Sequence, residues 1–363
     1  MMNKKILIVI GSFKTGGAER MAITVGEELN KSGYTVHYAL QKPIFEIPNV
    51  IDSDRIHLLN KSSNKNKYLF HLSSILNIFV LRLKLQPSFI IGFTYYSSFI
   101  ACFSLSRNVV GRFDINPYSL AKKRGRIASF VAYWPFVKKI VVPSYGIGDA
   151  LRKINGQLEK KILVIQNSID PLQVEILAAK QLEKEILPKS YIVAMGRFTS
   201  QKNYQLLLSS YAESKLKDKL NLVIIGDGKL KAELISIVER LKLTRKVTFT
   251  GFMENPFPII QNASFFVNTS NFESFCNVIL ESLTLGVPVI ATDCHYGPSE
   301  MIRHGYNGML FETKSRERLV DIFDDISSNH IQISELQVNA KKSVEKFYLS
   351  KVIGSWHQLL KDT

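Results

Sequence analysis

Cysteine is scarce in this chain. Only Cys102, Cys276 and Cys294 occur among 363 residues, and no two of them form a CxxC pair. An odd number without such a pair excludes a disulfide framework and a cysteine-rich zinc site, and it is typical of a reducing cytoplasm. The seven histidines form no HxxxH or HxH pair either. We therefore expect no metal ion and no cofactor in the chemistry of this protein.

Long apolar runs are also missing. The apolar run within Met1–Gly11 is too short for the core of a signal peptide, and no small-residue cleavage site follows it. The longest run, Leu69–Leu81, spans 13 residues and is interrupted by polar side chains, whereas about 20 residues are needed to cross a bilayer. We therefore expect no membrane-spanning segment. A hydrophobic content of 46% with 21% charged residues excludes a disordered chain.

Acidic residues are few in the first half of the chain. Residues 1–180 carry 25 Lys and Arg against 11 Asp and Glu, a net charge of +14. Residues 181–363 carry 22 against 20, a net charge of +2. This division indicates that one lobe faces a polyanion, which is either nucleic acid or an anionic membrane surface.

Two successive α/β patterns run along the chain. Lys4–Gly11 is an apolar run, Gly16 and Gly17 follow it, and a helical pattern covers Ala18–Lys31. This order predicts a buried parallel strand, a glycine turn and a helix. The same order starts again at Tyr191–Met195, which predicts two Rossmann-like doubly wound domains facing a cleft. Further strands are expected at 35–40, 89–92, 140–143, 162–166, 220–226, 247–251, 263–268 and 288–291.

The length also favours two domains, because single cores stop growing at about 250 to 300 residues. We expect an N-terminal domain at 1–168, a linker at 169–189 and a C-terminal domain at 190–340. A last helical segment, 341–363, carries Trp356 and other apolar residues that must dock on a core. The sequence leaves open whether this segment returns to the N-terminal domain.

Ligands of doubly wound folds bind where strands end and helices begin. The first such junction contains Gly16 and Gly17. Paired glycines let backbone amides approach a phosphate or a sugar, and the N-terminus of the following helix favours negative charge. The junction lacks GxGxxG and GK[ST], which argues against dinucleotide binding and against an NTPase phosphate loop. A tight turn without a ligand is the alternative.

The second junction starts with Gly196 and Arg197 and reaches Lys202 at the entry to a helix. Arginine provides a planar fork for phosphate oxygens and lysine provides a point charge. Together they suit a diphosphate, although both side chains could instead be solvated.

The third junction contains Glu273 and Glu281. On one continuous helix, this offset gives about 12 Å of rise and about 80° of rotation, which is too far apart for an acid/base pair. If the helix starts near Phe275, Glu273 lies in the turn and Glu281 lies about one helical turn inside. Two such carboxylates could hold hydroxyls at opposite ends of an elongated polyol. Ordinary glutamates around a helix start are the alternative.

In their order and spacing, these motifs resemble those of the retaining glycosyltransferases of family GT4, which have the GT-B architecture. The resemblance covers nearly the whole chain, and the E-x7-E pair is its most specific element. The matching motifs are GGAER at Gly16–Arg20, GRF with QKN at Gly196–Asn203, IIGDG at Ile224–Gly228, TGF at Thr250–Phe252, Glu273 with Glu281, and GVPVIATD at Gly286–Asp293.

The resemblance implies roles for the charged residues. Arg197 and Lys202 would bind the diphosphate of a nucleotide diphosphate-sugar and neutralise the leaving nucleotide in place of a metal ion. Glu281 would hold the ribose hydroxyls, and Glu273 the hydroxyls of the donor sugar.

Further donor contacts are implied for backbone and aromatic groups. The base would stack near Gly251 and Phe252, and Gly17, with Gly16 beside it, would approach the sugar or the β-phosphate. Backbone amides at the start of the E-x7-E helix would assist Glu273: Phe275, Cys276, Asn277 and Val278.

Two positions bear on the transferred sugar. Relatives carry a polar residue that reaches this sugar in the segment Arg112–Pro117, which makes Asp114 and Asn116 the candidates here. Ser274 and Cys276 stand where the commoner form of the motif has glycines, and added side chains there would narrow the sugar subsite.

The implied reaction moves a hexose or N-acetylhexosamine from a nucleotide diphosphate-sugar, expected to be a UDP-sugar, to a lipid-diphosphate-linked saccharide. An α-glycosidic bond would form in O-antigen, capsule or glycoprotein glycan assembly. We see no positioned nucleophile, which favours a front-face route in which the leaving phosphate deprotonates the acceptor. One alternative is a GT-B enzyme that epimerises or hydrolyses the sugar nucleotide, and another is a nucleic-acid-binding protein that uses the basic lobe.

Basic and aromatic residues are interleaved in two stretches of the first half, Lys61–Lys84 and Ser119–Lys139. Such segments fit an amphipathic helix on anionic lipid. We therefore expect a protein bound peripherally to the cytoplasmic face of the inner membrane, with no nucleic-acid partner. Ordinary core helices with solvated lysines are the alternative.

Overall fold

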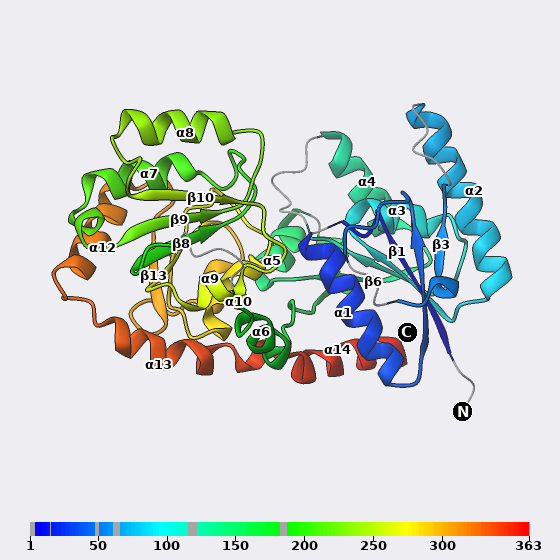
Figure 1. Cartoon of the computed structure of the whole chain (residues 1–363). Coiled ribbons are helices and arrows are strands. Elements are labelled where there is room, and N and C mark those ends of the chain that lie inside the picture. Colours follow the sequence, from blue (N-terminus) through cyan, green and yellow to red (C-terminus); the bar gives the residue numbers. More distant parts are fainter. Residues whose placement is uncertain are drawn as a thin grey trace. The chain divides into compact units, whose positions relative to one another are not determined.

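A computed structural model describes residues 4–14, 16–47, 51–60, 66–114, 122–154, 156–181 and 187–362. The chain forms two compact units (Figure 1). Unit 1 consists of Met1–Asn167 and Ser350–Thr363, and unit 2 consists of Ser168–Leu349. Each unit is a parallel sheet with helices packed against it, so the predicted pair of Rossmann-like doubly wound folds is confirmed.

Unit 1 contains a seven-stranded sheet in the order β3-β2-β1-β4-β5-β6-β7. Its central strand β1 is the first apolar run, and five of its six residues are buried. The order reverses between β1 and β4, so the connections after these two strands diverge and leave a crevice at their carboxyl ends. The strands are β1 Lys5–Ile10, β2 Thr35–Leu40, β3 Ile56–Leu58, β4 Phe89–Phe93, β5 Val109–Arg112, β6 Val137–Val142 and β7 Ile162–Val164. The helices are α1 Gly17–Lys31, α2 Lys67–Leu85, α3 Tyr95–Cys102, α4 Lys122–Tyr133, α5 Tyr145–Ile154 and α14 Leu349–Asp362.

Unit 2 contains a six-stranded sheet in the order β10-β9-β8-β11-β12-β13. Here the order reverses between β8 and β11, which places the equivalent crevice at the ends of these strands. The strands are β8 Tyr191–Met195, β9 Asn221–Ile225, β10 Val247–Gly251, β11 Phe266–Asn268, β12 Val289–Thr292 and β13 Gly308–Phe311. The helices are α6 Pro171–Ala178, α7 Tyr204–Glu213, α8 Lys231–Arg240, α9 Phe257–Gln261, α10 Asn277–Thr284, α11 Pro298–Met301, α12 Arg316–Ser327 and α13 Ile333–Ser343.

Three strands lie outside the predicted set: β3, β5 and β13. Each is only three or four residues long. β3 lies at an edge of its sheet and has no buried residue, so it lacks the apolar run that identifies a central strand. Short strands of this kind are recognised by the neighbour with which they pair rather than by their own pattern.

The segment 169–189 contains α6. The Asp170 side chain caps this helix by accepting hydrogen bonds from the amides of Leu172 and Gln173. Val174 and Ala178 are buried in the core of unit 2, where α6 packs against α9. The division of the chain accordingly places this segment in unit 2, which begins at Ser168.

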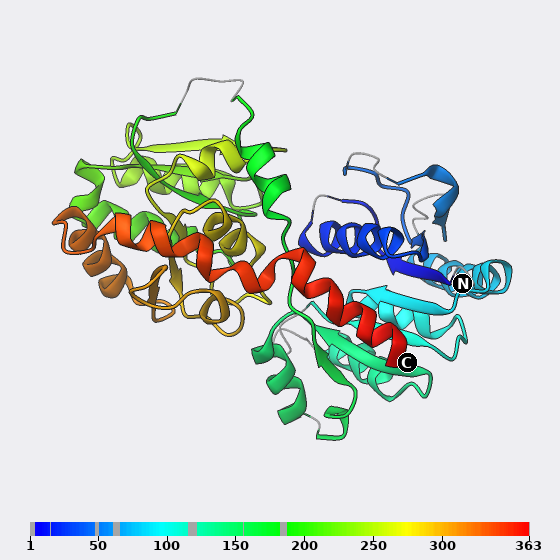
Figure 2. The same ribbon diagram turned by 90° about the horizontal axis from the view of Figure 1, so that it is seen from below.

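The last helix, α14, completes the core of unit 1 (Figure 2). Trp356 is 1% exposed, and its ring stacks on that of Phe93 with the centroids 5.8 Å apart. Val352 and Leu359 are buried in the same core. By contrast, the preceding helix α13 buries Leu336 and Ala340 in unit 2, so the C-terminal segment is divided between the two units.

Helix α2 is 19 residues long and extends beyond both ends of the 13-residue apolar run Leu69–Leu81. The helix continues through its polar residues because Asn77 donates a hydrogen bond to the carbonyl of Leu59 and the Asn60 amide donates to Ser74. By length and composition alone, Tyr68–Leu85 is sufficient to cross a membrane, contrary to the expectation of no such segment, and 22% of it is buried inside the protein.

Candidate functional site

In unit 2, two loops meet where the strand order reverses. One follows β8 and contains Gln201, and the other follows β11 and contains Asn271. The amide of Asn271 donates to the carbonyl of Gln201 at 2.8 Å, and the Gln201 side chain donates to the carbonyl of Phe272 at 3.0 Å. These bonds hold the second and third predicted junctions side by side.

The two loops bring Lys202 and Glu273 together. Lys202 Nζ lies 2.6 Å from Glu273 Oε1, and the Ser270 hydroxyl donates to the same oxygen at 2.7 Å. The two side chains are 17% and 9% exposed. Burial opposes the charge of Lys202, but the Glu273 carboxylate and its hydrogen bond outweigh burial and raise the pKa of this lysine. The lysine therefore remains charged at neutral pH.

This ion pair leaves the lysine able to bind an anion. An ammonium group has three N–H donors. One of them serves Glu273, and no second acceptor for Lys202 is found in the described part of the chain. A diphosphate oxygen could therefore bind Lys202 while Glu273 remains in place and orients it.

Arg197 is exposed at the end of β8 on a backbone that its neighbours fix. The Phe198 ring is buried and contacts Tyr204 and Phe249 edge to face, and its amide donates to the carbonyl of Asp227 at 2.9 Å. Gly226 has a φ of 139°, and a Cβ there would lie 2.1 Å from the Gly196 carbonyl oxygen. The loop that contains Gly196–Phe198 and the loop that contains Gly226–Gly228 are thus in direct backbone contact.

The start of α10 differs in detail from the expectation. The helix begins at Asn277 rather than near Phe275, and Cys276 precedes it with a left-handed φ of 74°. The Cys276 side chain is buried, and Asn268 donates a hydrogen bond to its Sγ at 3.1 Å. The expectation that this side chain narrows a sugar subsite is therefore wrong for Cys276, because the left-handed backbone turns it into the core.

The remaining residues of this segment have different surroundings. The Phe275 ring is buried against Phe347, with the centroids 5.6 Å apart, so only its backbone can contact a ligand. Asn277 and Val278 form the first turn of α10 and are half-buried. Glu281 lies one turn further along the helix and is also half-buried.

Buried thiols lie behind the ion pair. Burial, with a smaller effect of Glu273, raises the pKa of Cys294 to about 12 and that of Cys276 well above its ordinary value. Both thiols are therefore protonated at neutral pH and are poor nucleophiles.

At the end of β10, Phe252 is 61% exposed. The preceding Gly251 has a φ of 78°, and its carbonyl accepts a hydrogen bond from the Gly226 amide at 2.8 Å. Phe252 is thus an exposed aromatic side chain that follows a backbone in contact with the loop Gly226–Gly228.

In unit 1, Gly16 caps α1 and Gly17 is its first residue. A Cβ at Gly16 would lie 2.2 Å from the Glu19 carboxylate, so that carboxylate occupies the space beside the first turn. Because Glu19 is a flexible side chain that can move aside, this contact by itself does not require glycine at position 16.

Asp114 lies beside a buried arginine. Arg112 is 1% exposed, and its Nε donates to Asp114 Oδ1 at 2.8 Å. Its guanidinium also bonds to the Asn167 side chain and lies over the rings of Phe93 and Trp356. The Asp114 carboxylate therefore holds Arg112 at the end of β5. The other candidate, Asn116, lies outside the described residues.

Three polar residues near the crevices at the strand ends of units 1 and 2 were not among the predicted site residues. The first is Ser270, which stands three residues before Glu273, and the second is Tyr204. Burial raises the pKa of the Tyr204 hydroxyl, which has no hydrogen-bond partner among the described residues. The third is Thr94, which follows β4 and caps α3 by accepting from the Ser97 amide. Thr94 could have been found by inspecting the residue after every predicted strand.

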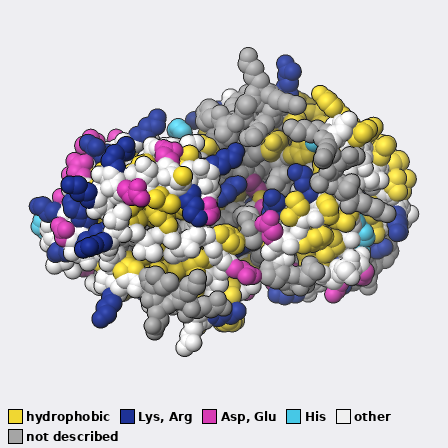
Figure 3. All heavy atoms as spheres, turned by 45° about the horizontal axis from the view of Figure 1, so that its top comes forward, with side chains coloured by type: hydrophobic (Ala, Val, Ile, Leu, Met, Phe, Trp, Pro, Cys, Tyr) yellow, Lys and Arg dark blue, Asp and Glu magenta, His cyan; other side chains and the backbone are white. Residues whose placement is uncertain are grey.

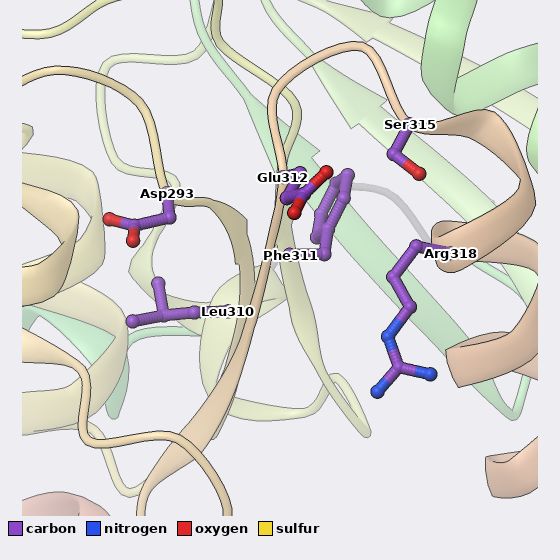
Figure 4. A pocket seen from close by; sticks show the side chains of 6 residues that line it. All are labelled: Asp293, Leu310, Phe311, Glu312, Ser315 and Arg318. Atoms are coloured by element: carbon purple, nitrogen blue, oxygen red, sulfur yellow. The ribbon is translucent and has the colours of Figure 1, made fainter.

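A pocket of about 360 Å³ lies at the carboxyl ends of β12 and β13 (Figure 4). Its lining includes Asp293 and Arg318 and contains none of the predicted donor residues. Within the described ranges, no three His, Cys, Asp or Glu residues lie close enough to hold a metal ion. The predicted donor residues of unit 2 therefore do not line this pocket, and Lys202 and Glu273 meet at the β8–β11 crevice instead.

Sequence comparisons link unit 2 to known enzymes. Residues 178–346 match the family model described as glycosyl transferases group 1. A Campylobacter jejuni N-acetylgalactosamine-N,N'-diacetylbacillosaminyl-diphospho-undecaprenol 4-alpha-N-acetylgalactosaminyltransferase is 36% identical over 160 residues, 44% of this chain and 42% of that enzyme. The Escherichia coli lipopolysaccharide 1,6-galactosyltransferase is 27% identical over 56% of each chain. The alignments thus span about half the length of these relatives.

Solved structures share the fold over the whole chain. The Anabaena protein HepE in complex with UDP and glucose has a TM-score of 0.83 at 19% identity, covering 99% of this chain and 100% of HepE. The apo form of the lipopolysaccharide outer core galactosyltransferase WaaB has a TM-score of 0.77 at 18% identity, covering 99% of both chains. At these identities, the similarity establishes the architecture of the two units.

Proposed function

We propose that this chain is a GT4-like glycosyltransferase that transfers a hexose or N-acetylhexosamine from a UDP-sugar to a lipid-linked saccharide, with retention of configuration. The observation that carries the proposal is the pairing of Lys202 with Glu273 at the switch point of unit 2, with Arg197 at the end of the adjacent strand. A fixed positive charge next to a fixed carboxylate matches a ligand that has a diphosphate at one end and sugar hydroxyls at the other.

The proposed step breaks the bond between the sugar C1 and the β-phosphate oxygen. A new bond forms between C1 and an acceptor hydroxyl oxygen on the same face, and the hydroxyl proton passes to the departing phosphate. Arg197 and Lys202 stabilise the negative charge that develops on that phosphate, in place of a metal ion. The Glu273 carboxylate orients Lys202 and accepts hydrogen bonds from the sugar.

The nucleoside end of the donor is assigned to the neighbouring loops. Glu281 accepts hydrogen bonds from the ribose hydroxyls, because it lies on α10 one helical turn beyond Asn277, the first residue of the helix that follows the Glu273 loop. Phe252 stacks on the uracil ring, because it is an exposed aromatic side chain at the end of β10. Support for a uridine nucleotide comes from HepE, which was solved with UDP.

Lipid-linked glycan assembly is the proposed setting. The Campylobacter relative is named for a diphospho-undecaprenol-linked acceptor, and the Escherichia coli relative is named for lipopolysaccharide. Both names describe saccharides joined to a lipid, and this supports a lipid-linked acceptor in O-antigen, capsule or glycoprotein glycan assembly.

A donor screen followed by a transfer assay tests the proposal. We expect UDP-sugars, but not GDP- or ADP-sugars, to raise the melting temperature, without added metal ions. With a lipid-diphosphate saccharide as acceptor, NMR of the product should show an α-anomeric linkage. UDP release without transfer would indicate a hydrolase, interconversion of the UDP-sugar would indicate an epimerase, and retention on RNA with no donor binding would indicate a nucleic-acid-binding protein.

A further inference from the structure

Helix α2 of unit 1 presents an apolar face to the outside. Of the 17 large hydrophobic side chains that are exposed in the described part of the chain, seven lie on this helix. Their exposure ranges from 37% for Phe79 to 87% for Tyr68. In Figure 3, hydrophobic side chains gather along the right-hand edge, the side on which Figure 1 draws α2. An apolar patch of this kind on a surface marks an interaction site.

The exposed residues follow helical spacing. Six of them recur every three or four positions and share one face of the helix, which we name the α2 stripe: Leu69, Leu72, Leu76, Phe79, Val80 and Leu83. On the opposite face, Phe70, Ser74 and Ile78 are buried in unit 1. The helix therefore has an inner face that packs on the protein and a second apolar face that faces outward.

The helix is fixed along the flank of unit 1. The strand before it, β3, and the strand after it, β4, belong to the same sheet. Asn60 and Asn77 join its middle to the end of β3, and His71 bonds to the Tyr96 hydroxyl on α3. A helix held in this way along its length cannot cross a bilayer, so its stripe can enter lipid only with the helix axis parallel to the surface.

The charge of α2 and of unit 1 indicates which kind of surface the stripe can bind. The sequence of α2 contains no Asp or Glu, and Arg82 and Lys84 lie in its last turn. Unit 1 as a whole carries 26 Lys and Arg against 10 Asp and Glu, a net charge of +16, whereas unit 2 carries 21 of each. All of the net charge is thus on the unit that bears the stripe, and this favours an anionic surface.

The other basic and aromatic stretch has a different structure. On α4, Phe130 packs against Phe99 and Phe103 of the α3 region, and Trp134 joins the same aromatic group. Among the described large hydrophobic side chains of α4, Tyr133 alone is exposed. The apolar side of α4 therefore forms protein core, which leaves α2 as the helix that can insert.

We propose that the α2 stripe docks unit 1 flat on an anionic phospholipid bilayer, with the six stripe side chains among the lipid chains and the basic residues at the head groups. The occupant is a lipid surface rather than a second copy of this chain, because two surfaces of the same positive charge repel each other. This inference goes beyond the proposed reaction and does not rest on it.

Vesicle flotation of the full chain tests the proposal. Vesicles contain either an equal mixture of phosphatidylglycerol and phosphatidylcholine or phosphatidylcholine alone. We expect the wild type to float with the anionic vesicles at low salt and to remain unbound with phosphatidylcholine. The triple variant Leu72→Ser, Leu76→Ser, Leu83→Ser should lose at least tenfold in binding to anionic vesicles.

A matched control changes three comparably exposed residues of unit 2: Leu172→Ser, Ile176→Ser and Val338→Ser. This control should bind vesicles like the wild type, and both variants should keep the wild-type melting temperature within a few degrees. If the triple variant has a much lower melting temperature than the wild type, the single variant Leu76→Ser replaces it. This variant should still bind anionic vesicles measurably less than the wild type.

Three results would overturn the proposal. The first is no binding of the wild type to anionic vesicles, and the second is unchanged binding of the stripe variants. The third is a wild-type dimer in light scattering that the stripe variant converts to a monomer, with vesicle binding unaffected. A soluble acceptor without a lipid separates this inference from the reaction, because the stripe variant should transfer sugar to it at the wild-type rate.

Discussion

Lys202 Nζ lies 2.6 Å from Glu273 Oε1, although the two residues are 71 positions apart in the chain. The pair joins the loops that follow β8 and β11, the strands between which the order of the unit 2 sheet reverses. The contact places a buried positive charge where a doubly wound fold binds its ligand.

The first prediction concerns Lys202→Ala. Removal of the ammonium group takes away a charge that stabilises the leaving diphosphate, so kcat/KM for sugar transfer should fall by about 10²- to 10³-fold. Steady-state kinetics with the UDP-sugar measure this loss. Lys231→Ala is the matched control, because Lys231 pairs with Asp227 on the surface of the same unit. Near-normal transfer by Lys202→Ala would remove the donor-site assignment.

The second prediction concerns Glu281→Ala. Loss of a carboxylate that accepts ribose hydroxyls should weaken UDP binding by about 1.5–3 kcal/mol, or roughly tenfold to a hundredfold. Isothermal titration with UDP measures the change. Glu239→Ala, at an exposed position on α8, should leave affinity unchanged. Equal affinity of wild type and Glu281→Ala would show that this carboxylate faces elsewhere.

The third prediction concerns alkaline pH. Burial, followed by Glu273, raises the pKa of Cys294 to about 12. An unfolded thiol ionises near pH 8.5, so the stability that this proton provides is complete below that pH and is lost as pH rises toward 12. The free energy of unfolding should therefore fall by about 1.4 kcal/mol per pH unit for this group in that window.

Chemical denaturation of wild type and Cys294→Ala at pH 8, 9 and 10, under reducing conditions, would measure this contribution. The free energy of unfolding of the variant should fall less steeply with pH, and the difference in slope should approach that of one proton, about 1.4 kcal/mol per pH unit. Identical slopes would mean that the Cys294 thiol is not held protonated by the fold.

The fourth prediction concerns Trp356→Ala. This ring is fully buried against Phe93, so its removal should cost about 3–5 kcal/mol. Calorimetry should show that unit 1 melts at a lower temperature, and UDP should still stabilise unit 2. His357→Ala, next in sequence but bonded at the surface to Ser32, should cost less than about 1 kcal/mol. Equal melting curves for both variants would contradict the docking of α14 on unit 1.

Local sequence patterns predict much of the fold. Apolar runs followed by glycine turns predict the strands and the helices after them, because a buried parallel strand must be apolar on both faces. The same rule predicts that Arg197, Lys202 and Glu273 lie at strand ends. The short strands β3, β5 and β13 are not predicted, because their partners rather than their own residues make them strands.

What the sequence by itself determined is the order of two doubly wound units and the motifs at their strand ends, since these depend on neighbours within a few residues. Tertiary structure alone decided that Lys202 pairs with Glu273, that Cys276 turns inward and that Trp356 returns to unit 1. It also decided which face of α2 is buried, because both faces are apolar and only packing against the sheet separates them. For Lys202 and Trp356, the deciding contacts join residues that lie far apart along the chain, so no local pattern reports them.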